Sequence, residues 1–164
     1  MRWSTECGSN DVGQRTIPSL RCFRPMRTVL RAGLLAFAVV ELVLGLWTLV
    51  FPASFYADVP TVDLTPPFSE HLMRDFGGAT LGLAIVLAAA GIWFERRLAI
   101  VALLAYLAFS VPHLVFHVGH LGNASATEAA VLVGLLAASV VVPAVLLAVA
   151  VRGVDVSPEL PGRR

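Results

Sequence analysis

Four long apolar runs constrain this chain more than any other feature of its sequence. The runs cover residues 32–56, 76–94, 98–121 and 129–151, and Glu41 is the only Asp, Glu, Lys or Arg inside them. An α-helix needs about 20 residues to cross a hydrocarbon core of about 30 Å. A membrane β-strand would instead alternate apolar and polar residues, and these runs do not alternate. The sequence therefore predicts an all-α protein, a bundle of four transmembrane helices.

Composition points to lipid and away from nucleic acid as a partner. The chain is 57% hydrophobic and 14% charged, whereas about 25% of residues are charged in a typical soluble domain. The formal net charge is only +1, which offers no basic face to a nucleic acid. All twelve basic residues are arginine, a composition typical of a GC-rich bacterial genome, so we expect the four helices to span the bacterial inner membrane. Besides the lipid bilayer, a second copy of the chain or a membrane partner protein is a candidate partner.

The positions of arginine predict the orientation in the membrane. Basic residues precede the first run, separate the second from the third and follow the fourth, as Arg15, Arg21, Arg24, Arg27, Arg31, Arg96, Arg97, Arg152, Arg163 and Arg164. The other two connections, residues 57–70 and 122–127, contain no Lys or Arg. Because cytoplasmic loops carry the excess of Lys and Arg, we expect both termini to be cytoplasmic.

We expect three segments along the chain. Residues 1–25 lack any sustained periodicity and predict a disordered cytoplasmic tail, and Met26 is an alternative start of translation that the sequence leaves open. Residues 26–152 form the predicted four-helix transmembrane domain, and residues 153–164 form a second cytoplasmic tail. Cys7 and Cys22 are not in a C-x-x-C arrangement, so we interpret them as free thiols.

Local signals predict helix ends and one helix contact. Pro52 is expected to end the first helix. Ser125 followed by Glu128 is a capping-box pattern that opens the fourth helix. Gly78 and Gly82 are four residues apart, a spacing of small residues that predicts close approach of the second helix to a neighbour.

The candidate site is a cluster of ionisable side chains in the outer halves of three predicted helices. Its members are Glu41, Glu70, His71, Arg74, Asp75, His113, His117 and His120. Such groups cost roughly 2.5–3.5 kcal/mol each at the centre of a bilayer, so they face the interior of a bundle and have a role. The three histidines of the third helix follow an i, i+4, i+7 spacing and so share one helix face.

The directions and depths of these polar side chains together predict a pocket. His71, Arg74 and Asp75 also share a helix face, at the same depth as the histidines. Two polar stripes at one depth reach each other only by facing inward. We therefore predict a polar pocket that opens to the external side, with Glu41 as its floor. Arg74 and Asp75 are alternatively structural ion-pair partners of Glu41 or a histidine across helices.

Three interpretations of this pocket compete. In the first, it binds a small ligand, a quinone-like headgroup or a redox partner. In the second, His113 and His117 bind a metal ion together with Asp75 or Glu41. In the third, the chain is a structural or accessory membrane subunit without catalytic activity. The cofactor, a quinone or a metal ion, is left open. The sequence has no P-loop, dinucleotide fingerprint or serine nucleophile elbow, so an enzyme is the less favoured class.

Three segments resemble a family of small four-helix membrane proteins found widely in actinobacteria. They are residues 52–56 (PASFY), residues 67–75 (PFSEHLMRD) and residues 111–117 (VPHLVFH) with His120. A more distant likeness is to DoxX-like four-helix proteins, some of which are linked to quinone-dependent sulfur oxidation. The resemblance implies the four-helix topology and no reaction.

Overall fold

A computed structural model describes residues 23–64 and 67–152 of the chain, with side chains from Met26 onward. The predicted tails therefore lie outside the described residues, except for residues 23–25. These three residues, predicted to belong to the first tail, begin the first helix instead.

The described residues form five α-helices and one short 3-10 helix, and they contain no strand. The helices are α1 (Phe23–Val50), α2 (Pro52–Asp58), η1 (Val62–Leu64), α3 (Glu70–Trp93), α4 (Arg96–Val118) and α5 (Ala126–Arg152). Four of them, α1, α3, α4 and α5, are long and apolar enough to cross a membrane. The all-α prediction with four candidate transmembrane helices is thus confirmed.

The helix ends follow local chemistry, with one correction. The backbone N–H of Ser125 donates to Glu128 Oε2 at 2.8 Å and the N–H of Glu128 donates to Ser125 Oγ at 3.3 Å, which confirms the capping box. Pro52 was expected to end the first helix, but α1 already ends at Val50 and Pro52 begins the additional helix α2. Proline suits this first helical position because its missing N–H would have no partner there.

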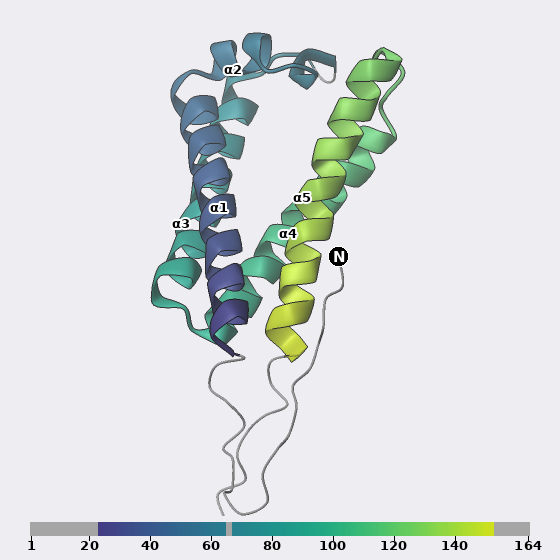
Figure 1. The fold of residues 1–164 in the computed structure, drawn as a ribbon. Coiled ribbons are helices and arrows are strands. Elements are labelled where there is room, and N and C mark those ends of the chain that lie inside the picture. Colours follow the sequence, from purple (N-terminus) through teal and green to yellow (C-terminus); the bar gives the residue numbers. More distant parts are fainter. Residues whose placement is uncertain (1–22, 65–66, 153–164) are drawn as a thin grey trace, which may run out of the picture.

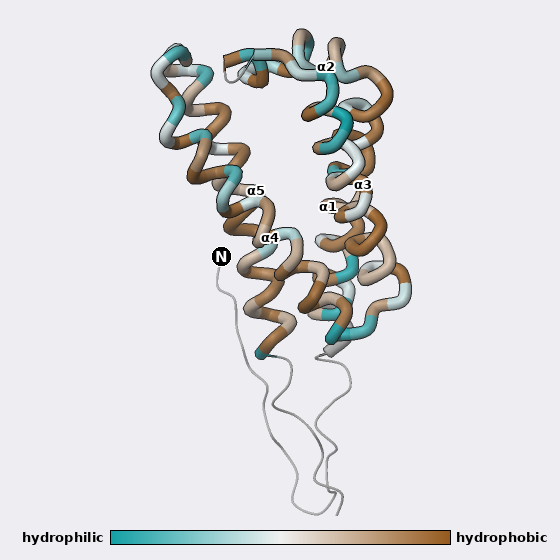
Figure 2. The backbone as a smooth tube through the Cα atoms, turned by 180° about the vertical axis from the view of Figure 1, so that it is seen from behind, coloured by the Kyte–Doolittle hydropathy of each residue, from teal (hydrophilic) through white to brown (hydrophobic). Residues whose placement is uncertain are grey.

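The four long helices form two antiparallel hairpins, α1 with α3 and α4 with α5 (Figure 1). The hairpins lie close together at the end where α1 begins and α5 ends, and they diverge toward the other end, where α2 lies across the tips of α1 and α3. We call these the terminal end and the α2 end. Apolar residues dominate the middle of every long helix, and hydrophilic residues concentrate near the helix ends (Figure 2).

The apolar core occupies the half of the bundle nearer the terminal end. Its buried residues are Leu30, Leu34, Ala38, Leu87, Ala90, Ala99, Ala102, Leu103, Tyr106, Leu146 and Ala150. Small alanines from α3 and α4 allow the helices to pack closely there. Many large apolar side chains point outward instead, such as Ile85 and Leu135, which are 69% and 68% exposed. An exposed apolar surface of this extent is what hydrocarbon would cover.

Backbone contact joins α1 to α3. A Cβ atom added at Gly77 would lie 2.7 Å from the backbone nitrogen of Leu49 and 2.9 Å from the carbonyl oxygen of Gly45. Only glycine therefore fits at this crossing. The predicted close approach through Gly78 and Gly82 is wrong, since a Cβ at either position would meet nothing within 4 Å. Adjacent residues differ by about 100° around a helix, so contact through Gly77 turns Gly78 away.

Two arginines link α1 and α3 by hydrogen bonds, one near each end of the helix pair. Arg31 Nε of α1 donates to the carbonyl oxygen of Gly91, near the end of α3, at 3.0 Å. Arg74 Nη1 of α3 donates to the carbonyl oxygen of Leu49, near the end of α1, at 2.6 Å. The last carbonyls of a helix have no partner within the helix. Each helix thus caps the carboxyl end of the other.

In the second hairpin, one arginine of α4 caps the carboxyl end of α5 in the same way. Arg96 Nε, in the first turn of α4, donates to the carbonyl oxygen of Ala150 at 2.6 Å, and its Nη2 donates to that of Val151 at 3.0 Å. A cation near a helix carboxyl end also interacts favourably with the helix dipole. The turn between α3 and α4 consists of Phe94 and Glu95, so Arg96, expected between the two helices, begins α4 instead.

Exchange of Gly77 for alanine should destabilise the protein much more than the same exchange at Gly78. The added methyl group at Gly77 forces α1 and α3 apart, and overpacking of this kind costs about 1–3 kcal/mol. At Gly78 the methyl group meets no atom, so we expect a change within about 0.5 kcal/mol. Thermal unfolding of both variants in one detergent measures the difference. Equal melting temperatures would contradict the backbone contact.

Candidate functional site

The eight predicted site residues do not form one pocket. Arg74 Nη2 forms an ion pair with Glu70 Oε1 at 2.8 Å, one turn away on the same helix. Its remaining hydrogen bond goes to the Leu49 carbonyl. Arg74 therefore belongs to the α1–α3 contact, and the predicted pairing with Glu41 or a histidine is not observed.

His71 and Asp75 face away from the second hairpin. His71 Nε2 lies 3.2 Å from Asp75 Oδ2, and their side chains are 88% and 63% exposed. They continue along α3 through Gly78 and Gly82 at i, i+4, i+7 and i+11, so all four share the outward face of this helix. The prediction that this stripe points inward is wrong, because the inward faces of α3 carry Gly77 and its neighbours instead.

Of the three histidines of α4, His113 and His117 lie close together, and His120 lies apart from them. His113 is half-buried, its ring stacks on Phe109 with centroids 5.3 Å apart, and it reaches within 6.4 Å of the Phe76 ring of α3. The His117 ring lies 4.6 Å from that of His113. The His113 ring therefore faces the first hairpin, and His117 lies on the same face of α4.

His120 does not belong to this group. Its ring stacks on Phe116 with centroids 4.1 Å apart, and Nδ1 lies 2.7 Å from the Phe116 carbonyl oxygen. The residue is exposed at the α2 end, beyond the last turn of α4. It takes no part in the contact between hairpins.

A row of polar side chains extends from His113 and His117 toward the middle of the bundle. Tyr106, Ser110, His113 and His117 follow the spacing i, i+4, i+7 and i+11 along α4, which places them on one face. We call these four residues the α4 stripe. With a rise of about 1.5 Å per residue, the stripe extends over roughly 16 Å. Tyr106 and Ser110 are 3% and 2% exposed, and the two histidines are half-buried.

Glu41 meets the stripe at its inner end. The Glu41 side chain, 4% exposed on α1, interacts with the Tyr106 hydroxyl, which also interacts with Ser139 of α5. Ser139 Oγ in turn donates to the Leu136 carbonyl at 2.8 Å. This network joins three helices and both hairpins. Glu41 therefore contributes at the inner end of the stripe, but its partner is a tyrosine and not a charged group.

Sequence reasoning missed Tyr106, Ser110 and Ser139. Each lies in an apolar run, where hydroxyl groups are common and carry no charge to attract notice. The available signal was the spacing, since Tyr106 and Ser110 precede His113 and His117 at helical intervals. A phenol hydroxyl in the middle of such a run also needs a hydrogen-bond partner.

Ser110 differs from Tyr106, the other fully buried member of the stripe, in its hydrogen bonding. Its Oγ is buried and has no hydrogen-bond partner among the described residues. A buried hydroxyl without a partner costs about 1–3 kcal/mol, and the large majority of buried side-chain polar atoms in proteins have a partner. The row from Tyr106 to His117 thus contains a polar atom that is free to bond with a ligand.

Two cavities lie away from the stripe. A cavity of about 330 Å³ at the α2 end is lined by Val50, Phe51, Pro52, Ala53, Ser54, Phe68, Glu70 and Arg74. Another of about 190 Å³ lies at the terminal end. The first includes two predicted site residues, Glu70 and Arg74, but neither cavity is lined by Glu41 or a histidine.

The predicted metal ligands are not brought together. Among residues 23–64 and 67–152, no group of three or more His, Cys, Asp or Glu side chains could hold a metal ion. His113 and His117 lie inward on α4, whereas Asp75 lies on the outward face of α3.

A double-mutant cycle on Glu41→Gln and Tyr106→Phe should reveal the link between α1 and α4. Each exchange alone leaves a buried polar group without its partner, which costs about 1–3 kcal/mol. The double variant should lose less than the sum, with a coupling of at least about 0.5 kcal/mol. Denaturation in detergent measures the unfolding free energies, and His120→Ala, at an exposed ring, should stay within about 0.5 kcal/mol of the parent. Strictly additive losses would refute the link.

Comparison with known proteins adds no family to this description. No family model matches the chain, and neither a curated protein nor a solved structure matches it. The role of the site is therefore argued from its own residues.

Proposed function

We propose that this chain is a multi-pass protein of the bacterial inner membrane that binds a small molecule with a polar headgroup, such as a quinone, between its two hairpins. The observation that carries the proposal is the buried Ser110 hydroxyl, which has no partner among the described residues and lies on the α4 stripe. Four apolar helices of membrane-spanning length support the location in a bilayer.

The chemistry of the stripe suits such a headgroup. Hydroxyl and imidazole groups both donate and accept hydrogen bonds, so Ser110 and His113, on one face of α4, offer donors to the carbonyl oxygens of a quinone. Phe109 lies beside His113, and Phe76 approaches both from α3, with a ring centroid 5.8 Å from that of Phe109. Aromatic rings of this kind pack on a planar headgroup. An apolar tail would leave between the hairpins into lipid.

Binding of a short-chain ubiquinone to the purified protein tests this proposal. Ser110→Ala and His113→Phe each remove a hydrogen-bonding group, and a net loss of about 0.5–1.5 kcal/mol per bond corresponds to roughly 2- to 13-fold weaker binding. Val111→Ala is the matched control, since Val111 adjoins Ser110 on α4 but is 41% exposed on the outward side. Isothermal titration in detergent gives the dissociation constants, and mass spectrometry identifies co-purified quinones. Undetectable binding, or equal losses in all three variants, would overturn it.

We also propose that both termini are cytoplasmic. The described arginines at the terminal end are Arg27, Arg31, Arg96, Arg97 and Arg152, whereas the α2 end carries Asp58, Asp63, Glu70, Asp75 and Glu128 with Arg74 as its basic residue. The excess of arginine at one end supports the cytoplasmic side for that end.

Single cysteines at the two ends test the orientation. In a background with Cys7→Ser and Cys22→Ser, Ala124→Cys lies in the α4–α5 connection and Glu95→Cys lies in the α3–α4 turn. A membrane-impermeant maleimide should label Ala124→Cys in intact spheroplasts and Glu95→Cys only after permeabilisation. The reverse pattern would place the termini outside.

A structural or accessory role is the second candidate, favoured by a specific observation. The Glu41–Tyr106–Ser139 network joins both hairpins, which is what a polar core that only sets helix packing would do. In that case Tyr106→Phe lowers stability, and neither Ser110→Ala nor His113→Phe changes the binding of any small molecule.

The resemblance to the actinobacterial four-helix proteins is part of the proposal. Its three segments correspond to α2, the start of α3 and the final turns of α4. All three lie at the α2 end, so the resemblance concerns the side of the bundle toward which the α4 stripe extends.

A further inference from the structure

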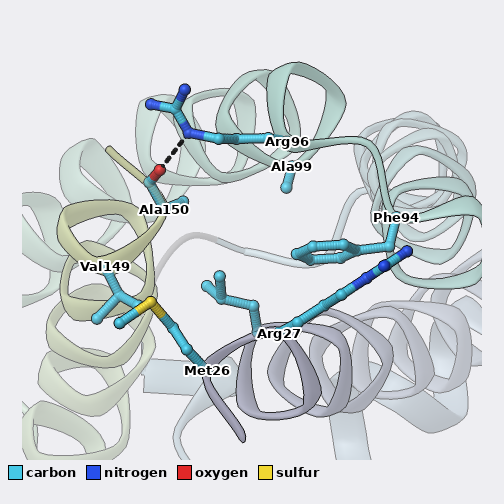
Figure 3. A pocket seen from close by; sticks show the side chains of 8 residues that line it. Met26, Arg27, Phe94, Arg96, Ala99, Val149 and Ala150 are labelled. Atoms are coloured by element: carbon cyan, nitrogen blue, oxygen red, sulfur yellow. Dashed lines mark hydrogen bonds between the residues drawn. The ribbon is translucent and has the colours of Figure 1, made fainter. Parts of the chain in front are cut away.

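The cavity at the terminal end combines an apolar lining with arginines. Its volume is about 190 Å³, and it lies between the start of α1, the α3–α4 turn and the end of α5 (Figure 3). The lining residues are Met26, Arg27, Leu30, Phe94, Arg96, Ala99, Val149 and Ala150. Six of the eight are apolar, so the interior of the cavity favours hydrocarbon over water.

The guanidinium groups of Arg27 and Arg96, which both line the cavity, differ in their contacts. Arg96 is held by the carbonyls of Ala150 and Val151. The Arg27 guanidinium lies over the Phe94 ring, 5.2 Å from its centroid. No carboxylate among the described residues pairs with Arg27. Figure 3 shows Arg96 extending toward Ala150 and Arg27 extending to the other side of the cavity, along Phe94. Arg27 thus retains donors for an anion at the edge of the cavity.

The surroundings add positive charge. Arg31, Arg97 and Arg152 lie in the same layer of the bundle, and Glu95 is the acidic residue among the described residues there. Basic clusters of this kind beside membrane helices attract anionic lipid headgroups. Guanidinium groups are also suited to bind phosphate through two parallel hydrogen bonds.

We propose that the terminal end holds an anionic phospholipid, with its phosphate on Arg27 and its first acyl methylenes in the apolar cavity. One molecule of this class supplies both features that the site requires. A free phosphate would leave the apolar lining unfilled, and a lipid without net charge would leave the positive layer unneutralised. The cavity holds only part of a lipid, so the remaining chain lies along α1 and α5 in the bilayer.

Lipid titrations with native mass spectrometry test the proposal on the full chain in a nonionic detergent. Phosphatidylglycerol should remain bound and raise the melting temperature, and phosphatidylcholine with the same acyl chains should do so at least about tenfold less tightly. Sodium phosphate at the same concentration should have no effect. Equal effects of the two lipids, or an equal effect of inorganic phosphate, would overturn the proposal.

Matched arginine variants locate the site. Arg27→Gln should weaken phosphatidylglycerol binding about 10- to 150-fold, which corresponds to the loss of about 1.5–3 kcal/mol for a charge-assisted hydrogen bond. Arg97→Gln removes the same charge one residue after Arg96, from a side chain that is exposed and does not line the cavity, and should retain binding. Arg27→Lys, which keeps the charge without the planar fork, should fall between. Equal losses in Arg27→Gln and Arg97→Gln would mean diffuse attraction only and would overturn a defined site.

Discussion

Contact between the backbones of α1 and α3 is the constraint on which the rest of the structure depends. At Gly45 and Gly77 the two helices touch without intervening side chains, and Arg31 and Arg74 cap the carboxyl ends of the opposite helices. Neither feature tolerates much rotation, because the glycines must face each other and each arginine must reach a particular carbonyl. The rotation of α3 is thereby determined, and with it the outward direction of His71 and Asp75. Arg74 is used for helix packing and is not available to a central pocket.

The second hairpin supplies the polar groups that do face inward. The α4 stripe runs from the Glu41–Tyr106 contact in the middle of the bundle to His117 near the α2 end. Tyr106, its innermost member, is buried and interacts with groups on two other helices, whereas Ser110 is buried without a partner among the described residues. We therefore assign helix packing to Tyr106 and ligand binding to Ser110 and His113. This difference is the physical basis for preferring a ligand site over a purely structural core.

The two ends of the bundle are built for different surroundings. At the α2 end, Trp47 packs edge-on against Phe55 and donates from Nε1 to Ser54 Oγ at 3.1 Å, so apolar rings and polar tips lie together as at a membrane interface. At the terminal end, arginines surround an apolar cavity. The proposed quinone-type site and the proposed lipid site thus lie in opposite halves of the molecule, and they share no residue.

The sequence by itself determined the four long helices and the inventory of polar groups. Long uncharged runs permit only helices in a bilayer, and the Ser125–Glu128 capping box is local chemistry that any context would preserve. The inward position of His113 and His117 also followed from helical spacing. Only the tertiary structure decided how each helix is rotated about its axis, because that rotation results from contacts such as Gly77 against Leu49 between residues far apart in the chain. For this reason Gly78, Asp75 and Arg74 were misplaced by sequence reasoning, and the uncharged Tyr106 and Ser110 emerged as the inner part of the site.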